Sequence, residues 1–211
     1  GLPEEQEHRV APMINNVWPR DVQLPAFLEA VIKDKSSIPA LFLLNAGGFM
    51  PGGANARAGH AAEIGAANGM TNARGLAGMY APLANGGGKL VDRDTLAEMG
   101  RVSMATHFDA TLCIPTRFAL GVMKSMDNRN RSDGAAIMPG IDSCLLCDAA
   151  FGHVGAGGSI GFADPECGLS FGYSMNRMGA GILLNPRGQA LVDATYKCLG
   201  YSENKSGVWR Q

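Results

Sequence analysis

The sequence predicts an α+β fold in which helices pack on an antiparallel sheet. Segments with helical periodicity come first, segments with the two-residue alternation of strands follow, and a capped helix closes the chain. No shift in composition marks an internal boundary along the 211 residues, a length typical of one domain or of a large part of one. We therefore expect residues 1–211 to belong to a single domain.

Three helices are expected in the first half of the chain. Apolar residues at i, i+3, i+4 and i+7 over residues 24–31 predict the first. The second begins at a Thr71 cap, carries an apolar stripe over residues 76–83 and ends at the glycine run 86–88. Asp92 is expected to cap the third helix.

Glycine is about twice as frequent as in an average protein, with 29 of 211 residues. The glycines follow no fixed period, which excludes a collagen-like chain or a simple repeat. They lie beside apolar residues, which indicates turns and close backbone approaches. Residues 45–70 are especially rich in Gly, Ala and Asn and predict a long irregular segment, of the kind that lines or covers a functional site.

Three strands and a final helix are expected in the second half. Alternating apolar residues predict strands at residues 117–123, 159–163 and 169–175, and the turn-forming residues 164–168 join the last two as a hairpin. The final helix begins at an Asn185 cap and ends before a glycine. The buried face of the first strand is expected to hold Phe118, Leu120 and Val122.

Charge and hydropathy exclude two classes of partner. Lys and Arg number 18 against 19 Asp and Glu, and no basic stripe is present, so we expect no nucleic-acid binding. No apolar run reaches the roughly 18–20 residues that a membrane span requires, so we expect no membrane segment. The hydrophobic fraction of 46% is typical of a folded chain with a substantial core.

The cysteines form no regular disulfide framework, and their odd number favours free buried thiols. Two of them make a C-x-x-C, which in other proteins forms a redox pair or half of a zinc site. Because no second C-x-x-C or H-x-x-x-H follows, we expect no metal and no cofactor. The five cysteines are Cys113, Cys144, Cys147, Cys167 and Cys198.

The first residues carry no targeting information. The chain begins at Gly1, without an initiator Met or a signal peptide, and its start resembles the interior of a longer gene product. The compartment is therefore left unassigned, with a cytoplasmic location favoured over the alternatives.

Two short motifs of serine hydrolases occur in positions that do not suit them. Ser159 lies in a G-x-S-x-G, but a nucleophile elbow requires a sharp turn into a helix, and here a strand pattern continues. Ser202 and Lys205 form an S-x-x-K, but that pair requires the first turn of a buried helix, and here it lies in a polar tail. We expect neither serine to be a nucleophile.

His153 is the remaining candidate for chemistry, in the run G-H-V-G-A-G-G before the strand at 159–163. The glycines would let a substrate approach the strand edge, where a backbone N–H can stabilise an oxyanion. They would equally suit a tightly packed strand with a structural histidine, and the residues alone leave both interpretations open. His8, His60 and His107 have no acidic or cysteine neighbours at ligand spacing and are expected to be structural or exposed.

Residues 152–178, G-H-V-G-A-G-G-S-I-G-F-A-D-P-E-C-G-L-S-F-G-Y-S-M-N-R-M, resemble the C-terminal part of class C-type serine β-lactamase-related proteins, which include esterases. The start G-L-P-E-E-Q-E-H-R-V-A and the helix T-N-A-R-G-L-A-G-M-Y-A-P-L-A-N-G-G are similar to the same subfamily. The resemblance covers nearly the whole chain. It implies a β-lactamase/transpeptidase-like fold, of which residues 1–211 would be the C-terminal portion.

The resemblance also implies a site. In that family an S-x-x-K carries the nucleophile, the tyrosine of a Y-x-N transfers protons, and a K-T-G or H-x-G lies on an edge strand. Only the third motif has a match, with His153 in the Lys or His position and Gly155 in the Gly position. By the same resemblance, the N–H of Ala156 would donate to the oxyanion, and His153 would orient the substrate or bond to the catalytic network.

The other two motifs are missing, because no Y-x-N occurs and the S-x-x-K of the tail is unsuitable. The resemblance therefore implies one segment of a serine hydrolase for a small ester, amide or lactam, acting through an acyl-enzyme on a nucleophile outside this chain. The alternative is a catalytically inactive binding or structural module. An incomplete sheet would leave an edge uncovered, so we expect a homo-oligomer or a complementing N-terminal segment as partner.

Overall fold

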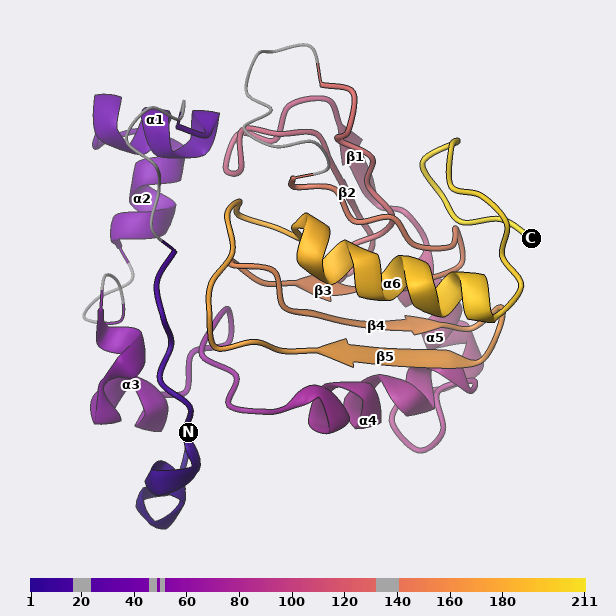
Figure 1. The fold of residues 1–211 in the computed structure, drawn as a ribbon, viewed down its shortest axis with the longest axis horizontal. Helices are drawn as coiled ribbons and strands as arrows, with labels where there is room; N and C mark the ends of the chain where they lie inside the picture. The colour runs from indigo at the N-terminus through magenta and orange to yellow at the C-terminus, as the bar shows by residue number, and fades with distance from the viewer. Residues whose placement is uncertain (17–23, 46–48, 50–51, 132–140) are drawn as a thin grey trace.

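The computed structural model describes residues 1–16, 24–45, 49, 52–131 and 141–211. Within these residues, helices lie around two short antiparallel sheets (Figure 1), which confirms the expected mixture of helices and antiparallel strands. The elements in chain order are η1 (Glu4–Arg9), α1 (Ala26–Lys33), α2 (Ile38–Leu44), η3 (Gly53–Asn55), α3 (Arg57–Ala61), α4 (Ala73–Ala84), α5 (Arg93–Gly100), β1 (Met104–Thr106), β2 (Thr116–Phe118), β3 (Phe151–Val154), β4 (Ile160–Asp164), β5 (Leu169–Tyr173) and α6 (Pro186–Cys198).

Strands β3, β4 and β5 form the central antiparallel sheet in that order, and β4 with β5 confirms the predicted hairpin. In this register, Phe162 stands opposite Gly152 on one side and Phe171 on the other. Strands β1 and β2 form a separate pair. Met123 connects the two sheets, since it pairs with both Phe118 and Gly152.

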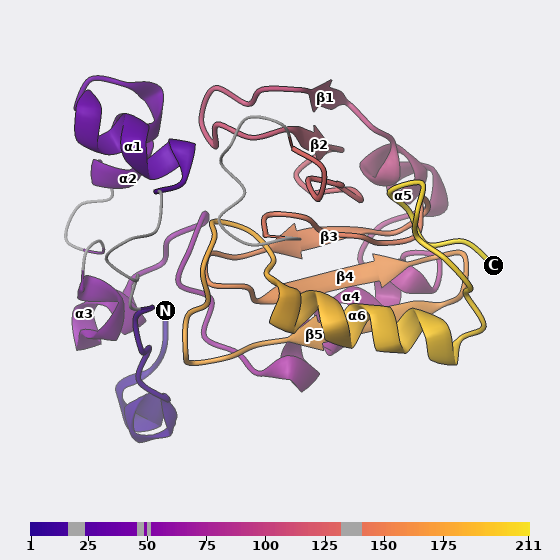
Figure 2. The ribbon, with the colours of Figure 1, turned by 45° about the horizontal axis from the view of Figure 1, so that its top comes forward.

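Helix α6 covers one face of the central sheet (Figures 1 and 2). Its Val192 and Tyr196 are fully buried there in a cluster that includes Phe162 of β4. The Phe162 and Tyr196 rings stack with centroids 6.1 Å apart, and Trp209 stacks on Tyr196 at 5.8 Å. Because large aromatic rings bury the most apolar area per residue, this face is the main hydrophobic core.

Helix α4 covers the opposite face, and two glycines of the sheet allow its close approach. A Cβ on Gly161 would lie 2.5 Å from the Tyr80 ring, and one on Gly172 would lie 2.4 Å from the Ala73 carbonyl oxygen. Neither strand position could therefore hold a larger residue without moving the helix. The buried residues of this second cluster are Tyr80, Ala84, Leu96, Ala119, Val122, Phe151 and Ala163.

The helix starts follow the polar caps, with one shift of position. Asn72 rather than Thr71 caps α4, because the Asn72 side chain accepts the N–H of Gly75 at 2.9 Å. Asp92 caps α5 and Asn185 caps α6, as predicted. An accepting side chain at these positions satisfies one backbone N–H that the first helical turn leaves without a partner.

The predicted strand over residues 117–123 is wrong in its second half. After β2 the chain reverses in a tight turn, in which the Ala119 N–H donates to the Val122 carbonyl at 2.8 Å. Gly121 supplies the positive φ of 72° that this turn uses. Leu120 is consequently 56% exposed instead of facing the core. Alternating apolar residues around a glycine fit a hairpin as well as a strand.

Residues 45–70 are more regular than their composition predicts. Their described part contains η3 and α3, whereas residues 46–51 lie partly outside the described residues. Asn68, with a φ of 58°, turns the chain back so that its side-chain amide donates to the carbonyls of Gly59 and Ala62 at 2.8 and 2.7 Å. These bonds satisfy carbonyls at and after the short helix α3.

Helices α1 and α2 pack on each other beside the end of the sheet at which β3 finishes (Figures 1 and 2). Phe27 and Val31 of α1 are buried with Ala40 of α2 and with Cys113, which confirms the helix predicted over residues 24–31. The sequence patterns do not predict α2, because its continuous apolar run has no helical periodicity. None of the described helices is long and apolar enough to cross a membrane.

Candidate active site

His153 extends from β3 on the face that α4 covers, and its side chain is exposed. Its Nδ1 lies 2.7 Å from the carbonyl oxygen of Val154. Because a carbonyl can only accept, Nδ1 carries the hydrogen in this contact, and Nε2 keeps a lone pair for another partner. Burial raises the pKa of Tyr80, and a hydrogen bond from the backbone of His153 opposes part of that rise. The His153 ring is thus held by the carbonyl of the next residue.

The outer edge of β3 is open beyond its first residues. Gly152 exchanges two backbone hydrogen bonds with Met123, at 2.6 and 3.0 Å, whereas the Gly155 N–H donates to the Ser159 carbonyl across the hairpin at 2.8 Å. Because the direction of the backbone groups alternates along an antiparallel strand, Gly152 and Val154 share the outer edge. Among the described residues, Met123 covers that edge at Gly152 only.

The turn after β3 presents an unpaired donor. Ala156 is exposed, and no hydrogen bond within the described part of the chain uses its N–H. It follows the end of the strand on which His153 offers Nε2. A backbone N–H and an imidazole at one strand end can bind a carbonyl oxygen and a neighbouring hydroxyl of a small molecule.

Packing requires most of the glycines around His153. A Cβ on Gly152, Gly157 or Gly158 would lie 2.2–2.6 Å from a neighbouring atom. A Cβ on Gly155 would meet only the hydroxyl of Ser159. Packing therefore accounts for Gly152, Gly157 and Gly158, whereas at Gly155 the only conflict, at 2.6 Å, is with the hydroxyl of Ser159.

Asn185 holds the turn against α6. Its Nδ2 donates to the Gly157 carbonyl at 2.9 Å, and its Oδ1 accepts the N–H of Gly188 at 3.3 Å as the cap of α6. The Gly157 carbonyl also accepts the N–H of Gly179 at 2.9 Å. The turn that carries the Ala156 N–H is consequently fixed by the helix on the far side of the sheet.

Neither serine motif has the geometry of a nucleophile. Ser159 directly precedes β4, so a strand and not a helix follows it. Ser202 and Lys205 lie outside any helix, and the Lys205 side chain is 89% exposed with its ammonium 3.9 Å from Glu203. The two residues therefore lack the buried helical turn that a Ser–Lys pair requires. Both motifs therefore lie outside the helical setting that they require, and that neither serine is a nucleophile stays a prediction.

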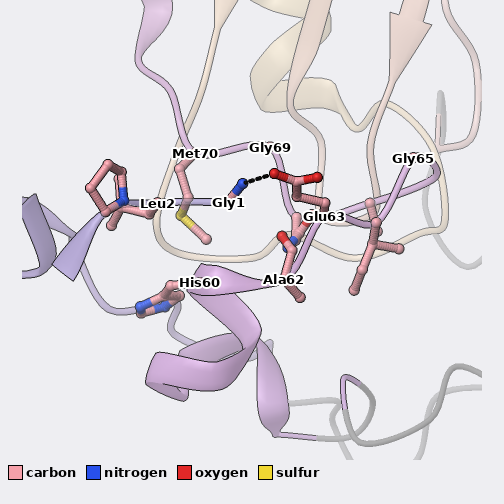
Figure 3. A pocket seen from close by; sticks show the side chains of 12 residues that line it. Gly1, Leu2, His60, Ala62, Glu63, Gly65, Gly69 and Met70 are labelled. Carbon is pink, nitrogen blue, oxygen red and sulfur yellow. Dashed lines mark hydrogen bonds and ion pairs between the residues drawn. The ribbon is translucent and has the colours of Figure 1, made fainter.

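A cavity of about 790 Å³ lies beside the N-terminal segment and not beside β3 (Figure 3). It is bordered by His60, whose Nδ1 lies 2.7 Å from Glu7, and by Glu63, which accepts the Gly1 amine at 3.2 Å. None of its described lining residues is a Ser, Thr, Cys, Lys or Tyr. This cavity therefore supplies no hydroxyl or thiol nucleophile from its described lining, although part of the segment 45–70 borders it.

The two thiols of the C-x-x-C are buried and are not activated. Burial raises the pKa of Cys144 and of Cys147 to about 12, and the Cys147 thiol donates to Glu166 at 3.1 Å. The expectation of buried thiols is wrong for Cys198, which is exposed, and Cys167 is half-buried. In the part of the chain that the structure describes, no three His, Cys, Asp or Glu residues are grouped to hold a metal ion.

A buried polar network lies at the other end of β4, and the sequence patterns do not predict it. Asp164 is 0% exposed and accepts the Tyr196 hydroxyl at 2.8 Å and the Glu166 N–H at 3.0 Å. The same hydroxyl accepts the N–H of Cys147 at 3.1 Å. In the sequence Asp164 looks like an ordinary turn residue, but it fastens the β4–β5 hairpin to α6.

A helix on each face of an antiparallel sheet and an H-x-G at the end of a sheet strand relate the chain to serine hydrolases of the β-lactamase and esterase type. The chain belongs to the Beta-lactamase family, whose match covers residues 1–193. It is 35% identical over 188 residues to the protein named Esterase/beta-lactamase LipL of Mycobacterium tuberculosis, and the match covers 83% of this chain and 38% of LipL.

Solved structures agree with this family. A family VIII carboxylesterase is 32% identical, with a TM-score of 0.65 over 94% of this chain and 46% of its own. EstA from Arthrobacter nitroguajacolicus Rue61a is 28% identical, with a TM-score of 0.69 over 95% of this chain and 49% of its own. The chain thus has the β-lactamase-like fold expected from the sequence, and it spans less than half the length of each of these relatives.

Proposed function

We propose that this chain is the C-terminal segment of a serine hydrolase that acts through an acyl-enzyme and whose nucleophile lies outside residues 1–211. The observation that supports this most directly is the end of β3, where the exposed His153 is followed three residues later by Ala156, whose N–H has no partner among the described residues. The half-length match to esterases and β-lactamases supports the same reading.

Each residue of the motif has a distinct role in this proposal. The Ala156 N–H donates one hydrogen bond to the oxyanion that forms when a nucleophile attacks the substrate carbonyl. His153 is fixed through Nδ1, so that Nε2 orients the substrate or accepts a hydrogen bond from the catalytic groups. Gly155 donates its N–H to the Ser159 carbonyl and so holds the turn that carries Ala156.

The substrate class follows from the carbonyl chemistry of this site and from the relatives. We propose a small carboxylic ester as the substrate, with amides and lactams as the related alternatives. LipL is named as an esterase and β-lactamase, and a solved relative is titled a carboxylesterase. No metal ion or cofactor has a role in this reaction scheme.

A chimera tests the proposal, with this chain in place of the matched 188-residue segment of LipL. We expect it to hydrolyse p-nitrophenyl butyrate and to be labelled by a fluorophosphonate on a serine of the LipL part. His153→Ala should lower kcat/KM roughly 100-fold, the scale of a lost transition-state hydrogen bond. His8→Ala is the matched control, because His8 is an exposed histidine of η1 and should leave kcat/KM unchanged.

Two results would contradict the proposal. A fluorophosphonate adduct on a serine of this chain in isolation would mean that the nucleophile lies within residues 1–211. A folded chimera that is neither labelled nor active would favour the alternative of an inactive binding or structural module.

A further inference from the structure

Two asparagines of the chain, Asn68 and Asn85, are each followed by a glycine. Asparagine is a thermolabile residue, because the main-chain nitrogen of the next residue can attack the carbon of its side-chain amide. A glycine in the next position favours this attack, since it has no Cβ and its backbone bends freely. Both pairs occur in the same tripeptide, Ala-Asn-Gly, so any difference in their reactivity in the folded chain comes from the structure.

The pair at Asn85 lies at the exposed end of helix α4. Asn85 is the C-terminal cap of this helix, and its side chain makes one hydrogen bond within the described residues, from Nδ2 to the Ala81 carbonyl at 2.8 Å. The N–H of Gly86 has no hydrogen-bond partner in the same part of the chain. The attacking nitrogen is therefore unpaired, and a single bond restrains the amide that it would attack.

The pair at Asn68 is held more tightly. Asn68 is half-buried, and its Nδ2 donates to two carbonyls, those of Gly59 at 2.8 Å and Ala62 at 2.7 Å. Both bonds must break before this nitrogen can leave, compared with one at Asn85. One additional hydrogen bond of ordinary net strength slows a reaction by about fivefold.

We propose that Asn85 is a site of non-enzymatic deamidation, at which the folded chain converts to aspartate and isoaspartate. The Gly86 nitrogen forms a bond to Cγ of Asn85, the bond from Cγ to Nδ2 breaks, and Nδ2 leaves as ammonia with the proton of the Gly86 amide. Water then opens the succinimide ring at Cγ, which gives aspartate, or at the main-chain carbonyl, which gives isoaspartate. The step consumes one water, releases one ammonia and involves no oxidation.

The product changes the end of α4. A carboxylate at position 85 cannot donate to the Ala81 carbonyl, so a carbonyl of the last helical turn loses its partner. The new negative charge also lies at the C-terminal end of the helix dipole, which repels anions. Arg93 would offset part of this repulsion, because its Nε lies 3.8 Å from the position of a Cβ on Gly86.

The same side chain lies beside the turn that joins β4 and β5. The Asn85 Oδ1 is 3.7 Å from the position of a Cβ on Gly168 in that turn. Helix α4 covers one face of the central sheet (Figure 1), and its last residue, Ala84, is buried. Deamidation at Asn85 therefore loosens the contact between the end of α4 and the β4–β5 hairpin.

Peptide mass spectrometry tests the reaction in the chain as it is. Trypsin cleaves after Arg57, Arg74 and Lys89, which places the two asparagines on separate peptides. The folded chain is incubated at pH 8, with the same chain unfolded in urea as the control. We expect Asn85 to deamidate about fivefold faster than Asn68 in the folded chain, and the two to react at similar rates in urea.

Three results would overturn the inference. The first is equal deamidation of Asn68 and Asn85 in the folded chain, and the second is deamidation of Asn85 in urea only. The third is a product at position 85 that contains aspartate without isoaspartate, because direct hydrolysis of the amide, with no attack by Gly86, gives aspartate alone.

A matched pair of variants tests the consequence for α4. Asn85→Asp reproduces the charged product, whereas Asn85→Gln keeps a neutral amide. We expect Asn85→Asp to lower the urea midpoint by about 0.5 M, through the lost hydrogen bond and the repulsion by the helix dipole. The midpoint of Asn85→Gln should stay within about 0.2 M of the unchanged chain. Equal midpoints of Asn85→Asp and the unchanged chain would show that the product leaves α4 intact and would overturn this part of the inference.

Discussion

The hydroxyl of Tyr196 holds two buried groups at once, so its removal should be costly. In Tyr196→Phe the ring and its stacking on Phe162 and Trp209 remain, but Asp164 loses a donor at 2.8 Å and the Cys147 N–H loses an acceptor at 3.1 Å. A buried polar group left without its partner costs about 1–3 kcal/mol. For the two groups together we expect the free energy of unfolding to fall by about 3 kcal/mol.

Urea unfolding at pH 7, followed by far-ultraviolet circular dichroism, measures this loss. With a slope of about 2 kcal/mol per M, the unfolding midpoint should fall by about 1.5 M. Tyr201→Phe is the matched control, because its ring packs on Tyr196 at 5.0 Å and its buried hydroxyl makes no hydrogen bond to nitrogen or oxygen among the described residues. We expect this variant to lower the midpoint by less than about 0.5 M.

Equal shifts in the two variants would refute the reasoning, because the loss would then come from the ring environment and not from the hydrogen bonds. A shift below about 0.3 M in Tyr196→Phe would mean that water replaces the hydroxyl at Asp164.

Two further predictions concern the buried carboxyl group of Asp142 and the closely packed Gly161. Burial raises the pKa of Asp142, so the folded chain binds the carboxyl proton more tightly than the unfolded chain does. This difference stabilises the folded chain in acid, and the stabilisation is lost as the pH rises through the raised pKa. Asp142→Asn keeps the oxygen that accepts the N–H groups of residues 182 and 183, so the urea midpoint of the variant should lack this loss as the pH rises above the ordinary pKa of an aspartate. Gly161→Ala should lower the free energy of unfolding by about 1–3 kcal/mol, because the added Cβ would lie 2.5 Å from the Tyr80 ring. Gly65→Ala is its control, since open space surrounds Gly65 and the midpoint should stay within about 0.2 M.

The elements with local signals could be predicted from the sequence. Asp92 and Asn185 cap their helices as predicted, because a capping bond involves residues only three apart. The β4–β5 hairpin was predictable for the same reason, since its turn residues lie between two alternating segments. The strand over residues 117–123 failed because Gly121 permits a reversal that alternation cannot reveal.

The candidate site depends on contacts that lie far apart in the chain. How much of the outer edge of β3 is paired depends on Met123, which pairs with this strand at Gly152. No local sequence pattern predicts that pairing. The burial of Asp164 depends on Tyr196, 32 residues away. His153 was found because its motif resembles that of a family, whereas its Nδ1 bond to Val154 required the coordinates.

Position 185 has to satisfy two demands that are usually met by different residues. Aspartate would accept the N–H of Gly188 as well as asparagine does, but its carboxylate could not donate to the Gly157 carbonyl. A serine would have to make both bonds with one oxygen, whereas the amide of Asn185 uses separate atoms, with Oδ1 accepting from the helix and Nδ2 donating to the loop. If the first turn of α6 loosens, the Gly157 peptide in the turn between β3 and β4 therefore loosens with it. The rigidity of α6 thus determines how accurately that turn is positioned.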